Sequence, residues 1–233
     1  MTINKEMLND FLALIYPRNC VSCGNSLFKH EEQVCNYCYT NLPKTNFHKL
    51  SRNPVDALFY GRTPLLLASS FYLFTKKGSI QKILHAIKYK HNKDLAVLVG
   101  KWYAEDLKTN DHISKADYII PVPLHSKKFK IRGYNQSEEF ARGLSEGLSI
   151  SLNTSVLKRK EFTETQTKKS KYERWENVED VFELISPETF ANKHIVIVDD
   201  VITTGATIEA CCQLLQQIEG IKISVLSIAY ADK

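Results

Sequence analysis

The sequence lacks the uncharged apolar run of about 20 residues that a membrane-spanning helix needs. Its longest apolar region, residues 65–74, is too short and contains two serines. The first twenty residues carry Lys5, Glu6 and Asp10 where a secretory signal peptide would have its apolar centre, and they show no small-residue cleavage site. We therefore expect no membrane span and a cytoplasmic location.

Internal repeats and low-complexity tracts are absent, and neither sign of charge dominates. The 31 Lys and Arg residues exceed the 26 Asp and Glu residues by only five, which gives a net charge of +5. Such a mild basic excess is compatible with a phosphate ligand or with nucleic acid and does not choose between them. With 233 residues, 43% of them hydrophobic, the chain is long enough for one α/β core and a small satellite.

Four of the six cysteines form two Cys-x-x-Cys pairs, Cys20 with Cys23 and Cys35 with Cys38. A cytoplasmic protein seldom keeps disulfides, so this spacing favours a metal site. Two such turns supply the four thiolates of a structural, tetrahedral zinc site with no open position for catalysis. Reduced packing cysteines or a redox pair are the alternative. The surrounding segment has little apolar content, so we expect metal binding to be coupled to its folding.

Hydrophobic periodicity predicts an α/β body with a parallel sheet flanked by helices. Near the C-terminus, a strand at 194–198, a helix at 206–218 and a strand at 221–229 form a βαβ unit with a right-handed crossover. The helix contains Cys211 and Cys212, which we expect to pack as small hydrophobes. Upstream we expect helices at 3–15, 79–90 and 95–107, strands at 65–74, 118–122 and 155–157, and a helix from the N-cap Ser137 to Leu148.

The chain is predicted to divide into two parts. Residues 1–45 would hold the first helix and the zinc-binding module, and residues 46–233 the α/β domain. We expect the charged residues 158–180 to form an insertion over the core, with a short helix at 170–176.

The most informative segment is 195–207, which reads IVIVDDVITTGAT. A buried strand is expected to end in Asp199 and Asp200, and a loop rich in threonine then leads into a helix. The start of a helix offers free backbone N–H groups and a favourable dipole to a phosphate. Two carboxylates would repel a bare anion, but they suit ribose hydroxyls and a Mg²⁺ ion beside the phosphate. The segment therefore predicts a phosphorylated sugar ligand with Mg²⁺.

This segment resembles the type I phosphoribosyltransferases, which bind 5-phospho-α-D-ribosyl 1-pyrophosphate (PRPP) through an apolar strand, two acids, two apolar residues and a Thr-Gly-x-Thr loop. The resemblance implies that Asp199 and Asp200 hold the ribose hydroxyls directly or through Mg²⁺. It also implies that the 5-phosphate is bound by Thr203, Thr204, Gly205, Ala206 and Thr207. Purine-salvage members carry Asp where this chain has Thr203, which argues against hypoxanthine or guanine as the acceptor. A phosphate-free turn of similar sequence is the alternative.

Further matches extend the resemblance. The segment 121–125 resembles the pyrophosphate-binding loop, which implies PRPP contacts from Pro123, Leu124 and His125; a purely structural role for the histidine is equally open. The run 127–137 is similar to that of the competence protein F family. The other similar features are the four-Cys module, Lys88-Tyr89, Arg159 with Thr163 and Gln166, and Arg174 with Asn177 and Phe182. The resemblance covers the chain from about residue 8 onward. It implies a zinc region joined to a phosphoribosyltransferase fold, and a link to DNA uptake in natural transformation.

Transfer chemistry would need positive charge beside the leaving pyrophosphate. The basic loop 127–132 is suitably placed, and Arg132 joins Asp199 and Asp200 as an expected catalytic residue; the lysines of this loop are as easily explained as a solvated surface. The sequence offers no convincing general base for an acceptor. Two functions are therefore open: a transferase with an unknown acceptor, and a non-catalytic PRPP sensor or single-stranded-DNA-binding adaptor for DNA uptake.

Nucleic acid is the alternative to PRPP as the partner of this chain. Between residues 158 and 174, seven basic residues are interleaved with Phe162 and Tyr172, a composition that suits single-stranded DNA. A solvated flap over the site explains the same composition. The expected partners are PRPP or a related ligand, single-stranded DNA and DNA-uptake proteins.

Overall fold

We describe the protein from a computed structural model, in which residues 16–160 and 181–232 are described. Its centre is a five-stranded parallel sheet with the order β1-β7-β6-β2-β3. These strands are β1 (Leu67–Leu73), β2 (Tyr118–Pro121), β3 (Ser151–Leu152), β6 (His194–Ile202) and β7 (Lys222–Tyr230). A separate antiparallel pair joins β4 (Leu157–Arg159) and β5 (Phe182–Leu184). The predictions for 3–15 and 170–176 lie outside the described residues.

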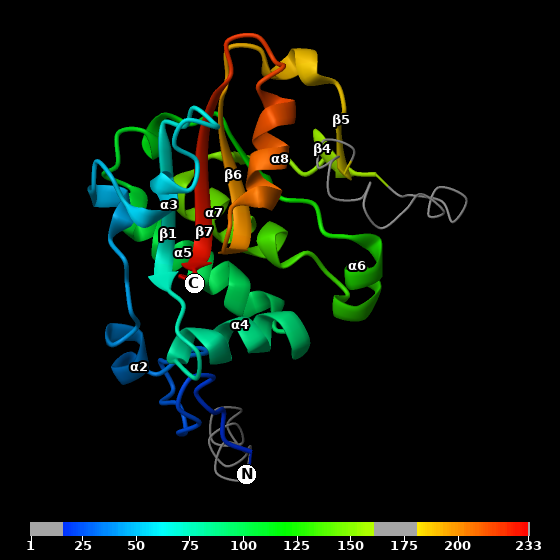
Figure 1. Ribbon diagram of the computed structural model, residues 1–233. Helices are drawn as coiled ribbons and strands as arrows, with labels where there is room; N and C mark the ends of the chain where they lie inside the picture. Colours follow the sequence, from blue (N-terminus) through cyan, green and yellow to red (C-terminus); the bar gives the residue numbers. More distant parts are fainter. Residues whose placement is uncertain (1–15, 161–180, 233) are drawn as a thin grey trace, which may run out of the picture.

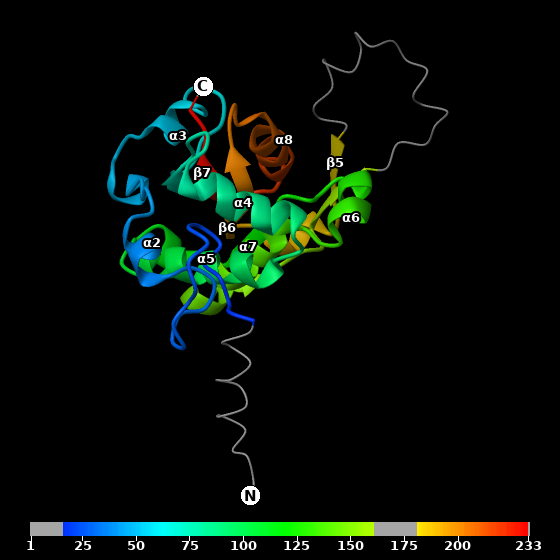
Figure 2. The ribbon, with the colours of Figure 1, turned by 90° about the horizontal axis from the view of Figure 1, so that it is seen from below.

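Helices cover both faces of the sheet. Figure 2 shows α3 and α8 on one side and α5 and α7 on the other, and Figure 1 shows α4 crossing the edge at which the strands end. The helices are α2 (Asn36–Thr40), α3 (Pro54–Ala57), α4 (Ser79–Tyr89), α5 (Lys93–Leu107), α6 (Ser126–Arg132), α7 (Gln136–Leu148) and α8 (Ala206–Leu215), with short 3-10 turns at Phe47–Lys49, Ile113–Lys115 and Pro187–Phe190.

The alternation of side chains along β6 divides the core into two layers. Val196 and Val198 pack among residues of α4, α5 and α7. Ile195 and Ile197 point to the opposite face and pack among residues of α3 and α8. Since both faces of the strand are buried, its apolar run is continuous, as expected for a strand inside a parallel sheet. The same layer holds Cys211 and Cys212, and both are buried as predicted.

The structure confirms the parallel α/β architecture and the βαβ unit of β6, α8 and β7, and it corrects several boundaries. β6 continues through Asp199 and Asp200 to Ile202, so the prediction that the strand ends at the two acids is wrong. The reason is that its last residues pair with β7, which is equally long at nine residues. The short strand expected at 155–157 lies at Leu157–Arg159, and α8 ends at Leu215 rather than at residue 218.

Two further local predictions are wrong. The N-cap of α7 is Asn135, whose side chain accepts a hydrogen bond from the backbone N–H of Ser137. Residues 127–132 form the helix α6 rather than a loop. His125 caps the start of this helix, and Gly133 ends it with a φ of +77°. A glycine directly after a run of helix-forming residues is a stop signal that the sequence did contain.

The cysteine-rich segment packs against the main body. Cys20, Val34, Cys38 and Leu42 are buried in the same hydrophobic cluster as residues of α4 and α5. The Tyr39 ring also lies 4.7 Å from that of Trp102 on α5, centroid to centroid. The apolar surface that this segment cannot build alone is therefore supplied by the α/β body. The boundary after residue 45 stays a prediction.

Among residues 16–160 and 181–232, no helix is long and apolar enough to cross a membrane.

Candidate functional site

The carboxyl ends of β2 and β6 lie at one edge of the sheet, because the two strands pair in parallel. Figure 1 shows the end of β6, the start of α8 and the helix α4 at this edge. Ligands of open parallel sheets bind at this edge, because loops that follow neighbouring strands face each other there. Most of the predicted ligand-binding residues belong to these segments.

Asp199 is held by two hydrogen bonds to a single carboxylate oxygen. Its Oδ1 atom accepts one from the Ser137 hydroxyl at 2.9 Å and one from the Asp200 backbone N–H at 2.8 Å. Burial raises the pKa of Asp199 to about 7, and the neighbouring Asp200 charge adds to the rise, while these hydrogen bonds and Lys88 oppose it. The carboxylate is thus fixed in position and costly to ionise without a cation.

Asp200 forms an ion pair with Lys88 at the end of α4. The Lys88 Nζ atom lies 3.0 Å from Asp200 Oδ2, and the two side chains are only 21% and 15% exposed. Paired carboxylates are the hard oxygen ligands that Mg²⁺ takes, and the ammonium group shows that a cation is accommodated beside them. The donor set therefore fits Mg²⁺.

The loop between β6 and α8 has an exposed surface and a buried anchor. Thr203, Thr204 and Thr207 are exposed, whereas Gly205 is buried with a φ of +80°. A Cβ atom at Gly205 would lie 3.0 Å from the Phe59 ring, so both the backbone conformation and the space require glycine. Asp199 and residues 201–208 together line one hollow, and α8 begins at its wall. This arrangement offers a helix N-terminus and hydroxyl groups to a phosphate.

The loop after β2 is tied to the start of α7. The buried Asn135 side chain donates to the carbonyl oxygen of Val122 at 3.0 Å. Pro123 and Leu124 are half-buried beside it. The Nδ1 atom of His125 accepts a hydrogen bond from the Lys127 backbone N–H at 3.1 Å, which supports the structural alternative for this ring nitrogen.

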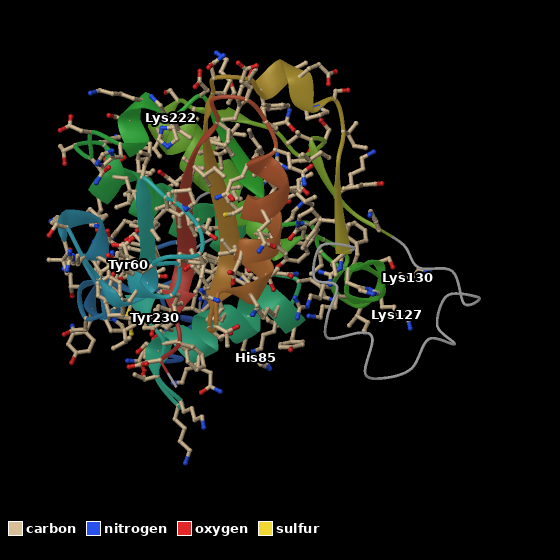
Figure 3. The ribbon with its side chains drawn as sticks, turned by 45° about the horizontal axis from the view of Figure 1, so that its top comes forward. Tyr60, His85, Lys127, Lys130, Lys222 and Tyr230 are labelled. Atoms are coloured by element: carbon tan, nitrogen blue, oxygen red, sulfur yellow. The ribbon has the colours of Figure 1, made fainter. Side chains whose placement is uncertain are left out.

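Arg132 lies at the flank of this edge. Its Nη1 atom donates to Gln136 Oε1 at 2.7 Å, and its guanidinium carbon is 5.7 Å from the centre of the Tyr89 ring. Figure 3 shows Lys127 and Lys130 on the same helix, α6, at one side of the molecule, and His85 on α4. In the structure Arg132 therefore contacts residues of α4 and α7 rather than the two acids.

The sequence assigned no site role to three contributors. Lys88 and Arg159 belonged to the family resemblance alone, and the contact of Lys88 with Asp200 joins residues from two distant elements. Phe59 packs against the glycine of the loop. The half-buried guanidinium of Arg159 lies 5.2 Å from the centre of the Phe182 ring. Burial lowers the pKa of Arg159, and nearby Cys211 and Asp199 oppose this. No local sequence signal identifies such contacts.

The second candidate site is the cysteine cluster. One ligand sulfur from each of the four cysteines lies within 4.8 Å of all the others, and the Sγ atoms of Cys23 and Cys35 are 3.8 Å apart. Four ligands bound at about 2.3 Å in a tetrahedron would be about 3.8 Å apart, so the cluster fits a metal such as zinc. The backbone N–H of Cys35 donates to Cys20 Sγ at 3.3 Å. Burial alone would raise the pKa of Cys20, but such backbone hydrogen bonds bring it to about 6.

Glu31 shapes the turn that carries the second cysteine pair. Its buried carboxylate accepts hydrogen bonds from the backbone N–H groups of Phe28 at 2.8 Å and Asn36 at 2.7 Å. These bonds lower the pKa of Glu31, so it stays ionised while it organises the backbone around the cluster. The module is thus held together by polar contacts and the thiol cluster rather than by a core of its own.

A roomier hollow of about 510 Å³ lies between α5 and α7, away from the ends of the strands. Charged residues dominate its walls, and some already pair with each other, such as Lys101 with Glu146 at 2.9 Å. Exposed pairs of this kind are common on surfaces and indicate no chemistry, so we place the candidate site at the strand ends.

The chain is similar to known proteins over much of its length. Residues 135–232 match the phosphoribosyl transferase domain family. Competence protein F of Haemophilus influenzae is 29% identical over 213 residues, which are 91% of this chain and 84% of that protein. The DNA utilization protein YhgH of Salmonella typhimurium is 29% identical over 136 residues, which are 57% of this chain and 59% of that protein.

Solved structures are more distant. The allosteric regulatory enzyme of purine biosynthesis is similar with a TM-score of 0.40 and 20% identity, over 58% of this chain and 25% of that one. A likeness at this level supports no assignment of function. The informative comparisons are therefore the match to the phosphoribosyl transferase domain family and the similarity to the two named relatives.

Proposed function

We propose that this chain, a homologue of competence protein F with a phosphoribosyl transferase domain, binds PRPP or a closely related phosphoribosyl ligand at the ends of β2 and β6. Asp199 and Asp200 would hold the ribose hydroxyls and a Mg²⁺ ion, and residues 203–207 would bind the 5-phosphate. The observation that carries the proposal is the single hollow shared by Asp199 and the threonine-rich loop. Bound Mg²⁺ would neutralise part of the pyrophosphate charge.

In this proposal Pro123, Leu124 and His125 lie along the pyrophosphate, and Arg132 supplies positive charge from the flank. The bond between Asn135 and Val122 keeps the β2 loop against α7, whose Ser137 orients Asp199. The two halves of the donor site would therefore be positioned by one helix start. Such pre-positioning favours binding because little ordering remains to be done when the ligand arrives.

Calorimetric titration of PRPP into the zinc-loaded chain, with and without Mg²⁺, tests the binding. Saturable binding that ribose 5-phosphate weakens by competition is the expected result. Absence of binding at millimolar PRPP would reject the proposal. Pyrophosphate release then separates the two versions of the function. A transferase supplied with cell extract as acceptor source releases it, and Asp200→Asn abolishes the release, whereas a PRPP sensor releases none.

A structural zinc ion in the four-cysteine cluster is part of the same proposal. The mutual distances of the four thiols favour it, and so does the absence of a separate hydrophobic core among residues 16–45. All four positions are cysteines, so the ion would have no place for a substrate. Its role would be to fold the segment that packs against α4 and α5.

A second candidate function, binding of single-stranded DNA, is favoured by the surface of the cysteine-rich segment. Phe28 and Tyr37 are 71% and 77% exposed there, and the His30 ring stacks at 6.0 Å from that of Phe28. Arg18 Nη2 donates to the carbonyl oxygens of Phe28 and Lys29, which brings positive charge next to the rings. Stackable rings beside cations suit nucleotide strands. Most of the basic segment 158–174 lies outside the described residues.

Fluorescence anisotropy with a labelled oligonucleotide tests this second function. Replacing Phe28 and Tyr37 by alanine should weaken binding about tenfold or more, because each lost ring removes one stacked base. If this double variant binds the oligonucleotide as the unaltered chain does, the surface is not the contact site. Tyr60, which is 84% exposed on a different part of the chain, provides the control substitution Tyr60→Ala.

A further inference from the structure

Lys88 places its ammonium group directly beside the Asp200 carboxylate. Its Nζ atom is 3.0 Å from Asp200 Oδ2, and both side chains are largely shielded from water. The free form of the site therefore already contains a cation that belongs to the chain.

The position of Lys88 is set by its neighbours. It lies in the last turn of α4, where the helix dipole favours a cation. The preceding residue, Ile87, is fully buried, and its carbonyl oxygen accepts a hydrogen bond from the Tyr134 hydroxyl. The following residue, Tyr89, lies against Arg132. The lysine backbone is thus fixed on both sides, while its long side chain can still turn away from Asp200.

An ammonium group and a divalent metal cannot both make close contact with the same carboxylate oxygen without strong repulsion, because the site is half-buried and poorly screened. Asp199 Oδ1 is also engaged by Ser137 and the Asp200 backbone N–H. A metal that binds Asp200 Oδ2 in the ligand-free protein must therefore displace Lys88 first. A ligand with several phosphate charges offers the ammonium group another partner and would remove this obstacle.

We propose that Lys88 is an internal cation that competes with a divalent metal for Asp200 and keeps the metal out until an anionic ligand draws the lysine away. The metal then binds together with, or after, the phosphorylated ligand. This inference rests on the metal-binding role proposed for Asp200. It makes Lys88 a positioning residue that sets the order of binding.

The test is a titration of the zinc-loaded, full-length chain with Mn²⁺ alone, in which electron paramagnetic resonance measures the free ion. Lys88→Met should bind Mn²⁺ about tenfold more tightly than the unaltered chain, because the competing charge is gone. Lys88→Arg keeps the charge and should stay weak. Lys90→Met, an exposed lysine at the end of the same helix, is the matched control and should change nothing.

The double variant Lys88→Met/Asp200→Asn tests whether the tighter Mn²⁺ binding of Lys88→Met occurs at Asp200. This double variant should bind Mn²⁺ more weakly than Lys88→Met. If Lys88→Met is unfolded by circular dichroism, Lys88→Gln takes its place in the same comparison. Mn²⁺ affinity unchanged by removal of the lysine would overturn the inference.

The ligand provides an independent readout. Saturating PRPP should raise the Mn²⁺ affinity of the unaltered chain more than that of Lys88→Met, because only the former has a lysine to displace. Equal enhancement in both proteins would contradict the proposed order. If PRPP binds neither protein, the proposed donor function fails, and the titrations with Mn²⁺ alone still decide the role of Lys88.

Discussion

The hydroxyl of Ser137 lies 2.9 Å from Oδ1 of Asp199, although the two residues are 62 positions apart in the chain. One stands in the first turn of α7 and the other near the end of β6. The bond connects the loop that follows β2 to the two acids, so the proposed pyrophosphate and ribose contacts share one rigid support.

Ser137→Ala removes the only side-chain hydroxyl that donates to Asp199 among the described residues. Because this bond favours the ionised carboxylate, PRPP affinity in the presence of Mg²⁺ should fall about tenfold. Calorimetry measures the change. Ser145→Ala, whose hydroxyl bonds to the Ile150 carbonyl oxygen in the last turn of α7, should leave the affinity intact. An equal loss in both variants would point to general damage to the helix.

Gly205→Ala should disable the threonine-rich loop. The added methyl group meets the Phe59 ring at 3.0 Å in a backbone conformation that already disfavours alanine. We expect PRPP affinity to fall by more than about tenfold. Gly61→Ala is the control, since Gly61 has a φ of +72° but open space around its Cβ position. If both variants bind PRPP like the unaltered chain, the loop is not the phosphate site.

Cys35→Ser should lower the zinc content of the purified chain and its melting temperature together. The thiol cluster takes the place of a core in this segment, so metal loss unfolds the local structure. Zinc is measured by atomic emission spectroscopy, and unfolding by circular dichroism. Cys212→Ala, which removes a buried thiol of α8, should melt earlier and retain its zinc. Full zinc content in Cys35→Ser would show that the cluster is not the metal site.

Protonation of His194 should destabilise the fold as the pH falls through about 6.5. Asp199, whose pKa burial raises to about 7, acts in the opposite direction. Burial lowers the pKa of the His194 ring, whose Nε2 atom is 2.9 Å from the Ser224 hydroxyl oxygen. The unfolded chain therefore takes up the proton more readily than the folded one, which favours unfolding in acid. Protonation of His48 should also favour unfolding as the pH falls, because burial lowers its pKa as well.

Urea denaturation at a series of pH values measures this effect. His194→Gln should flatten the dependence of the unfolding free energy on pH between about 7.5 and 5.5. The exposed His85→Gln is the control and should leave the slope unchanged. If the unfolding free energy depends on pH identically in all three proteins, His194 does not contribute to this dependence.

Local patterns predicted the sheet, most helices and the cysteine cluster. The continuous apolar run of β6 predicts a buried strand, and the two Cys-x-x-Cys pairs predict a metal site. In both cases the prediction needs only the residues of that segment.

The error at the cap of α7 is local, because Asn135 lies only two residues before Ser137 and accepts a hydrogen bond from its backbone N–H. The error at β6 arose where a distant partner decides the local structure, since the pairing with β7 carries β6 past its acids. The contact of Lys88 with Asp200 is of the same kind, because packing of α4 across the sheet edge brings them together. A single sequence contains no spacing rule for such contacts.

Calorimetric titration of PRPP with Mg²⁺ into the unaltered chain and into Asp199→Asn/Asp200→Asn tests the central claim most directly. We predict saturable binding to the unaltered protein and none to the double variant, with both equally folded and equally loaded with zinc. Equal affinity for the two proteins would contradict the account, because the ligand would then bind somewhere other than the ends of β2 and β6.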